Sequence, residues 1–198
     1  MSTIFFNSHQ SKSYKNESWR HIFSQWYCSG QPFIGKSAIY DLSDFILKDD
    51  WDDLILNKQF WVREQWMMYL KALIFAKDEY RTENLGIADQ IIKTNDPAII
   101  KALGRTVKGY SDNVWDNCKF KVVVNGNYLE FTQNKEMRDI LMNTGDRRIF
   151  EAAPKDSVWG IGLNETNAKK TDESKWGQNL LGKSIMEVRT YLQQQQQQ

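Results

Sequence analysis

The stretch 63–76, "REQWMMYLKALIFA", constrains the fold more than any other part of the chain. Met, Leu, Ala, Lys and Glu favour helices, and no Gly or Pro interrupts the pattern, which continues through polar residues to Tyr80. From Trp66 to Ala76 nearly every residue is apolar, so this helix has no wide polar face to turn toward water. The sequence therefore predicts a central buried helix with other elements packed around it.

Further helices are predicted where apolar periodicity is bounded by helix start and stop residues. Asp96 can cap a helix that starts at Pro97, and Gly104 suits its end. Gly145 suits the end of another helix. The predicted helices span 82–94, 95–107, 135–145 and 181–192, and 147–153 reads as a strand.

Two segments are harder to assign. In 114–134, Val-rich runs flank Asn125-Gly126 as in a β-hairpin, whereas Trp115, Cys118, Val122 and Leu129 fall near helical spacing. The segment 38–57 mixes apolar and acidic residues, and we interpret it as a short helical or irregular insert. Local propensity leaves the choice for 114–134 open.

Composition excludes several classes of protein. A net charge of +1 provides no global field for nucleic acid or membranes, although a local basic patch is still allowed. Two widely spaced cysteines, interpreted as packing residues, favour a reducing compartment, and two histidines make a His-based zinc site improbable. No signal peptide or membrane span is expected. We predict a cytosolic or nuclear protein without a metal ion or cofactor.

Five segments, in order, resemble one family, the YbiA-like or NADAR domain proteins. They are "SQWYCSGQPF", "REQWMMYLKALIF", "NDPAIIKALGRTV", "TGDRRIFEAAPKDSVWGIG" and "WGQNLLGKSIMEVR". Together they cover most of the chain from about Phe23 to Leu192. The order and spacing of all five make the match specific, whereas each one alone is weak.

The resemblance implies an α+β fold, a mainly helical single domain with a small β-sheet, over residues 1–192. The glutamines at 193–198 are expected to form a disordered tail. The resemblance also implies a long helix after Trp115, in preference to the hairpin. This chain departs from the family pattern at 34–60, which is longer than the usual short hairpin, and at the long loop 163–175. Both could flank a pocket, so they bear on substrate size.

The resemblance implies N-glycosidase activity. Family members hydrolyse glycosylamine intermediates of riboflavin synthesis or remove ADP-ribose from the amino group of guanine in nucleic acid. We expect the second activity here, with ADP-ribose or a ribosylamine as substrate and ADP-ribosylated DNA or RNA as a partner. The alternatives are the riboflavin branch, a non-catalytic ADP-ribose or nucleotide-binding module, and a structural interaction protein. The last rests only on the glutamine tail. The sequence does not indicate an oligomeric state.

Cleavage of a ribosyl–amine bond needs an acid near the leaving nitrogen and a nucleophile or activated water near the anomeric carbon. Glu64 and Lys71 lie about two helical turns apart on one face of the predicted central helix. The resemblance matches Glu64 to the family's active-site acid. A desolvated Lys71 can form a Schiff base with a sugar aldehyde, or it can stabilise charge. Spacing alone favours a structural salt bridge between the two residues.

The connector "EAAPKDSVWGIG" combines acids, glycines and a Trp. Trp159 is the first candidate for stacking on a base, and Gly160 would let backbone approach the ligand. A Trp that plugs the loop onto the core is the alternative. Asp156 can orient water or bind a ribose hydroxyl as a catalytic residue, or it can cap a turn. Glu151 can support the site, or it can be a simple strand residue.

Three further residues are candidates for substrate binding. Trp115 can stack on a base, with core packing an equal alternative. Asn179 can bind ribose or phosphate through its amide, or it can cap the last helix. Arg105, at a helix end, can contact phosphate, or it can be a solvated arginine favoured by the helix dipole.

Overall fold

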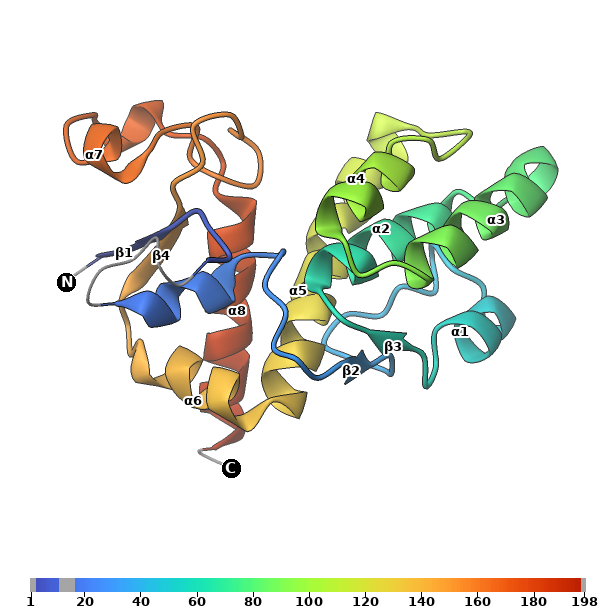
Figure 1. Cartoon of the computed structure of the whole chain (residues 1–198), viewed down its shortest axis with the longest axis horizontal. Helices are drawn as coiled ribbons and strands as arrows, with labels where there is room; N and C mark the ends of the chain where they lie inside the picture. The colour runs from blue at the N-terminus through green and yellow to red at the C-terminus, as the bar shows by residue number, and fades with distance from the viewer. Residues whose placement is uncertain (1–2, 11–16, 197–198) are drawn as a thin grey trace. The chain divides into compact units, whose positions relative to one another are not determined.

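The computed structural model describes residues 3–10 and 17–196. The chain divides into two compact units, one made of Met1–Tyr27 with Asn134–Gln198 and the other of Cys28–Gln133. The described residues are mainly helical, and each unit contains one two-stranded sheet (Figure 1). The α+β, mainly helical fold is confirmed, while the assignment of 1–192 to a single domain stays a prediction.

The unit Cys28–Gln133 is built around α2 (Arg63–Ile74). This helix packs against α3 (Arg81–Ile92), α4 (Pro97–Gly104) and α5 (Asp112–Gln133), as Figure 1 shows. All of its residues except Lys71 are buried, which confirms the predicted core helix. The other elements of this unit are β2 (Phe33–Ile34), α1 (Lys48–Leu54), β3 (Gln59–Phe60) and the 3-10 turn η3 (Asp78–Tyr80).

Packing explains why the segment around Asn125-Gly126 is helical and forms part of α5. A Cβ on Gly126 would come within 2.5 Å of the Trp66 ring, so glycine lets α5 approach α2 closely. The Trp66 indole also donates a hydrogen bond of 2.8 Å to the Val122 carbonyl. The Asn125 amide both donates to and accepts from the backbone of Tyr40, at 2.8 Å each. These tertiary contacts outweigh the local hairpin signal.

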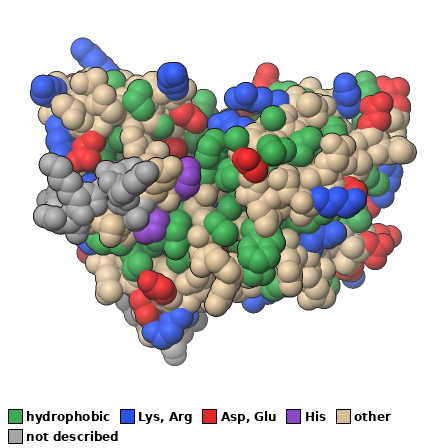
Figure 2. All heavy atoms as spheres, viewed as in Figure 1, with side chains coloured by type: hydrophobic (Ala, Val, Ile, Leu, Met, Phe, Trp, Pro, Cys, Tyr) green, Lys and Arg blue, Asp and Glu red, His purple; other side chains and the backbone are tan. Residues whose placement is uncertain are grey.

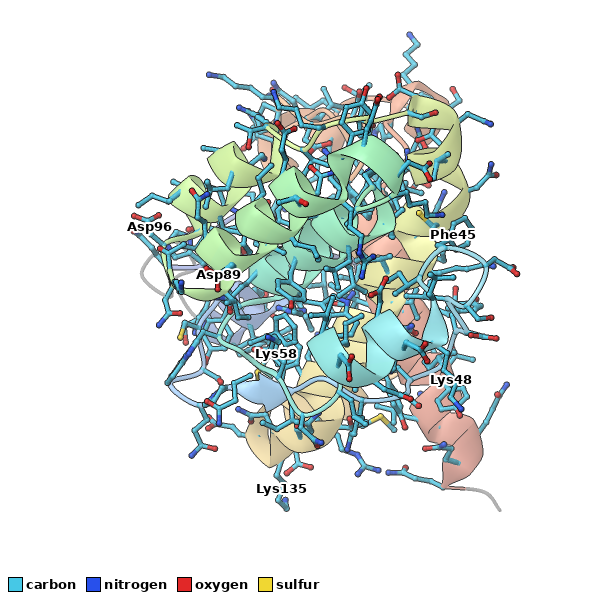
Figure 3. The ribbon with its side chains drawn as sticks, turned by 90° about the vertical axis from the view of Figure 1, so that its right-hand side faces the viewer. Phe45, Lys48, Lys58, Asp89, Asp96 and Lys135 are labelled. Atoms are coloured by element: carbon cyan, nitrogen blue, oxygen red, sulfur yellow. The ribbon has the colours of Figure 1, made fainter. Side chains whose placement is uncertain are left out.

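The start of α4 follows the predicted pattern, and the glycine at its end serves packing and not a left-handed turn. The Asp96 carboxylate (labelled in Figure 3) accepts a hydrogen bond from the Ala98 backbone at 2.8 Å, and Pro97 occupies the first turn. Gly104 ends the helix without a left-handed conformation. A Cβ at Gly104 would lie 2.1 Å from the Met68 sulfur, so glycine lets α4 pack directly onto α2 without a shift of Met68.

The insert between β2 and β3 is held at both ends by the pairing of these two strands. The two short strands pair antiparallel, with Phe33 opposite Phe60. The Gln133 side chain accepts from the Ile34 backbone at 2.8 Å and donates back to it at 2.9 Å. Between the strands the chain forms α1, in agreement with the predicted short helical insert.

The second unit holds a parallel strand pair, β1 (Thr3–Phe6) and β4 (Arg148–Glu151), with α8 (Leu180–Gln195) packed on β4. Its remaining elements are η2 (Ser18–Phe23), α6 (Lys135–Asn143), α7 (Glu165–Ala168) and η4 (Glu173–Lys175). Gly145, with φ of 56°, follows the end of α6 as predicted. Strand β4 confirms the predicted strand.

Two predictions need adjustment. Helix α8 continues to Gln195, beyond the predicted boundary at 192, because glutamine propagates a helix well once packing has started it. Residues 197–198 of the predicted tail lie outside the described residues. Cys118 is buried, as a packing residue should be, but Cys28 is exposed, so its interpretation as a packing residue was wrong.

Two kinds of feature are absent from residues 3–10 and 17–196. In this described part, no helix is long and apolar enough to cross a membrane. Among the same residues, no three His, Cys, Asp or Glu side chains gather where they could hold a metal ion. On the face drawn in Figure 2, acidic and basic side chains are interspersed, which agrees with the net charge of +1.

Candidate functional site

The predicted site residues form two groups, and each group lies within one compact unit. Cys28–Gln133 contains the Glu64–Lys71 pair and two of the candidate binding residues. The other unit contains the loop after β4 and the start of α8. The first group is Glu64, Lys71, Arg105 and Trp115, and the second is Glu151, Asp156, Trp159, Gly160 and Asn179.

Glu64 lies in the first turn of α2 and is only 6% exposed. Its carboxylate is therefore near the positive end of the helix dipole, which stabilises a negatively charged side chain. Seven residues of helix separate Glu64 from Lys71 by about 10.5 Å along the axis. The structural salt bridge that spacing alone favoured stays an alternative prediction.

A buried ion pair that the sequence did not reveal anchors this first turn. The Arg63 guanidinium lies 2.6 Å from the Glu130 carboxylate of α5, and both side chains are almost fully buried. Arg63 also donates a hydrogen bond of 2.7 Å to Asn127 and lies over the Phe131 ring at 5.1 Å. Since Arg63 precedes Glu64, these contacts fix the backbone that carries the candidate acid.

Burial raises the pKa of Glu130 to about 7, although the Arg63 charge opposes the shift. An acid whose folded-state pKa is raised binds more protons when folded than when unfolded. The free energy of unfolding should therefore fall as pH rises from about 4.5 to about 7. In Glu130→Gln this part of the slope should disappear, as measured by urea denaturation across that range. Glu83→Gln, an exposed control on α3, should keep the wild-type slope. An unchanged slope in Glu130→Gln would contradict the assignment.

Lys71, in the last turn of α2, is half-buried, and its amine contacts a carbonyl and two rings. The amine donates a hydrogen bond of 2.9 Å to the Gly104 carbonyl and lies 4.3 Å from the centre of the Tyr110 ring. The Trp115 ring centre is 5.8 Å away. Burial lowers the pKa of Lys71, Asp112 raises it, and Arg105 lowers it. A lysine with a lowered pKa is more often neutral, as a nucleophile must be.

The two other candidates of this group differ in exposure. Trp115 is 6% exposed in the first turn of α5, which favours the core-packing interpretation, with its ring toward the amine of Lys71. Arg105 is exposed and follows α4 as its C-cap residue. Its guanidinium is therefore free to face solvent, as both the phosphate and the helix-dipole interpretations require.

In the second group, Asp156 organises its own loop. Its carboxylate accepts hydrogen bonds from the backbone of Val158 at 3.0 Å and of Trp159 at 2.8 Å, which is the turn-capping alternative. Gly160 also serves the loop itself, because a Cβ there would lie 2.8 Å from the Glu151 carbonyl. Close backbone packing therefore accounts for this glycine, and a catalytic role for Asp156 stays a prediction.

The loop 157–160 is hydrogen-bonded along its length to the start of α8. The carbonyls of Ser157, Val158, Trp159 and Gly160 accept from the backbone of residues 178–181 at 2.8–3.1 Å. A Cβ on Gly177 would lie 2.5 Å from the Ser157 carbonyl. These contacts join the two Trp-Gly segments of the sequence and hold the half-buried Trp159 on a fixed backbone.

Asn179 joins the same loop to β4. Its side chain accepts from the Glu151 backbone at 2.9 Å and donates to the Ile149 carbonyl at 2.9 Å. It occupies the N-cap position of α8 in a left-handed conformation, φ of 54°, but makes no side-chain cap, so that alternative was wrong. Glu151, half-buried, ends β4, and the Ile161 backbone donates to its carbonyl at 2.8 Å. Ligand roles for both residues stay predictions.

Comparison with known proteins identifies the family. A model of the NADAR domain matches residues 5–193. An N-glycosidase of Acanthamoeba polyphaga mimivirus is 34% identical over 181 residues, which are 91% of this chain and 92% of the relative. Protein irg-1 of Caenorhabditis elegans is 32% identical over 174 residues, 86% of this chain and 75% of the relative.

Two further similarities agree. An N-glycosidase of Nostoc punctiforme is 33% identical over 93 residues, 47% of this chain and 53% of the relative. The solved structure of the E. coli protein YbiA covers 100% of this chain with a TM-score of 0.63 and 19% identity, and this chain covers 90% of it, which shows a shared fold. The family model and the relatives named N-glycosidases define a glycosidase-class enzyme. It belongs to the NADAR domain family and is an N-glycosidase.

Proposed function

We propose that this N-glycosidase removes ADP-ribose from the amino group of ADP-ribosylated guanine in nucleic acid. The observation that carries the proposal is the arrangement of α2, with the buried acid Glu64 in its first turn and the half-buried amine of Lys71 in its last. A binding module without catalysis needs neither group. The half-buried Trp159, on a loop that is hydrogen-bonded throughout, supports recognition of a base.

In the proposed reaction, protonated Glu64 donates its proton to the guanine amino nitrogen as the bond to ribose C1 breaks. The neutral Lys71 amine bonds to C1 and loses one proton to solvent, and Glu64 regains its proton from solvent. The C1–O4 bond then breaks, the remaining Nζ proton passes to the ring oxygen O4, and a Schiff base is left between C1 and Nζ. Water then adds to this C=N bond, and ADP-ribose leaves with the Lys71 amine restored.

The substrate is tested with an oligonucleotide that carries one ADP-ribosylated guanine. Incubation with the enzyme should remove one ADP-ribosyl group and leave the guanine intact, as measured by mass spectrometry of the oligonucleotide. Glu64→Gln serves as the inactive control. An unchanged oligonucleotide together with loss of ribose from a glycosylamine intermediate of riboflavin synthesis would move the protein to the metabolic branch.

Base stacking by Trp159 is tested by affinity. Trp159→Ala should weaken ADP-ribose binding by about 1–3 kcal/mol in calorimetry, with little change in thermal stability, because each stacked base contributes about that much. The matched control is Trp176→Ala, since Trp176 packs against Phe5 and Phe150 at 5.9 and 5.0 Å between ring centres. The control should lose stability and keep affinity. If Trp159→Ala binds ADP-ribose as tightly as the wild type, or if the variant unfolds, Trp159 packs its loop onto the core and does not stack on a base.

A further inference from the structure

Tyr110 lies directly against the candidate nucleophile, although the proposed reaction does not use it. Its ring centre is 4.3 Å from the Lys71 amine, and its side chain is 42% exposed. An exposed tyrosine on a loop normally rotates freely, because water is its only neighbour. A tyrosine that covers an amine from the solvent side must be held in place by its surroundings.

Two contacts hold the Tyr110 side chain, and the backbone before it is constrained. Its hydroxyl donates a hydrogen bond of 2.9 Å to the Asp112 carboxylate, and its ring centre is 5.4 Å from that of Phe75. The preceding Gly109 has φ of 63°, and a Cβ there would lie 2.5 Å from the Tyr80 ring. Partial burial and Asp112 raise the pKa of Tyr110 to about 12, so the hydroxyl remains a donor at neutral pH.

The ring and the Gly104 carbonyl together define where the Lys71 amine lies. The Gly104 carbonyl accepts a hydrogen bond from the Lys71 amine. The face of the Tyr110 ring attracts an ammonium group, but it cannot replace the hydrogen bonds that water would make to that group. The charged groups facing Lys71 are Asp112 at the start of α5, which favours the ammonium, and Arg105 after α4, which opposes it. Removal of the ring would let water reach the amine.

We propose that Tyr110 is a positioning residue, whose ring, held by Asp112 and Phe75, keeps the Lys71 amine against the Gly104 carbonyl and partly shielded from water. Its catalytic consequence rests on the proposed function of Lys71 as the nucleophile. The positioning itself is a property of the protein that is measured without any substrate.

The direct test is competitive labelling of lysines with acetic anhydride at a series of pH values, read by mass spectrometry. In the wild type, Lys71 should label with a midpoint below that of an ordinary lysine, because burial lowers its pKa. Tyr110→Ala should raise this midpoint and speed labelling at high pH, while Tyr110→Phe, which keeps the ring, should follow the wild type. Asp112→Asn can still accept from the hydroxyl but removes a negative charge, so the midpoint should fall.

Lys58, labelled in Figure 3, is the internal reference in each protein. Its amine lies 5.5 Å from the centre of another ring, that of Tyr69. Its labelling should not change in any of the variants. Ile99→Ala, at an exposed apolar position of α4, controls for loss of a surface side chain. A Lys71 profile in Tyr110→Ala that coincides with the wild type would overturn the proposal.

Activity separates this proposal from the assigned reaction. Tyr110→Ala should lower kcat at neutral pH by about tenfold, because a misplaced and more often protonated amine attacks poorly. The low-pH limb of the rate profile should move to higher pH, and KM should change little. Tyr110→Phe should restore the wild-type profile. If Tyr110→Ala shifts the labelling midpoint of Lys71 but the wild type cleaves no ribosyl–amine bond, the positioning role of Tyr110 is supported and the proposed function fails. If the enzyme is active but neither its rate profile nor the labelling of Lys71 changes in Tyr110→Ala, only the positioning role of Tyr110 is wrong.

Discussion

Glu64→Gln should lower turnover of ADP-ribosylated guanine by about a hundred- to ten-thousand-fold, the usual loss when a general acid or base is removed. Glutamine keeps the shape and much of the hydrogen bonding of Glu64 but cannot exchange a proton. Substrate binding should therefore survive, since the substitution leaves the buried first turn of α2 in place through Arg63 and Glu130. Single-turnover kinetics and calorimetric affinity measure the two effects separately.

The control for this substitution is Glu83→Gln, which makes the same chemical change at an exposed position of α3. It should retain wild-type turnover. Thermal unfolding of each variant shows whether lost activity follows lost structure. If Glu64→Gln melts far below the wild type and its remaining folded fraction keeps full specific activity, Glu64 is a structural residue and the catalytic assignment fails.

Lys71→Ala should abolish the covalent intermediate as well as most of the activity. A Schiff base between the Lys71 amine and the opened sugar is reduced by borohydride to a stable secondary amine. Wild-type protein treated with substrate and borohydride should therefore gain the mass of the sugar adduct on the peptide that contains Lys71, and Lys71→Ala should gain none. The lowered pKa of the half-buried amine favours the neutral form that this proposed step requires.

Lys71→Arg keeps the positive charge but cannot form the Schiff base, so it separates the two possible roles of Lys71. An adduct in the wild type together with an inactive arginine variant supports nucleophilic attack. Activity in Lys71→Arg, with no adduct in any protein, would show that the residue only stabilises charge. Lys93→Ala, at an exposed position just after α3, is the control and should retain both adduct and turnover.

Features carried by consecutive residues were predictable from the sequence. The unbroken apolar run of α2 predicted its place in the core, because such a helix has no face that water can solvate. Asp96 and Pro97 predicted the start of α4, and Gly145 the end of α6, since capping depends on one turn of backbone. Glu64 was a candidate because of the resemblance to a family.

Contacts between residues distant in the chain were decided by the tertiary structure. Asn125-Gly126 reads locally as a hairpin turn, yet it is helical because Gly126 admits the Trp66 ring and Asn125 satisfies the backbone of Tyr40. Asn179 makes no side-chain cap but satisfies the backbone of β4, and its role as a ligand stays a prediction.

The environment of Lys71 shows the same division. Its place on the central helix follows from the sequence, but the Gly104 carbonyl and the Tyr110 ring that surround its amine come from residues 33 and 39 positions later in the chain. Desolvation depends on which atoms exclude water from a group, and local spacing cannot reveal atoms that only packing brings near. The sequence by itself determined that a lysine interrupts the apolar helix, and the tertiary structure decided that its amine is shielded enough to have a lowered pKa.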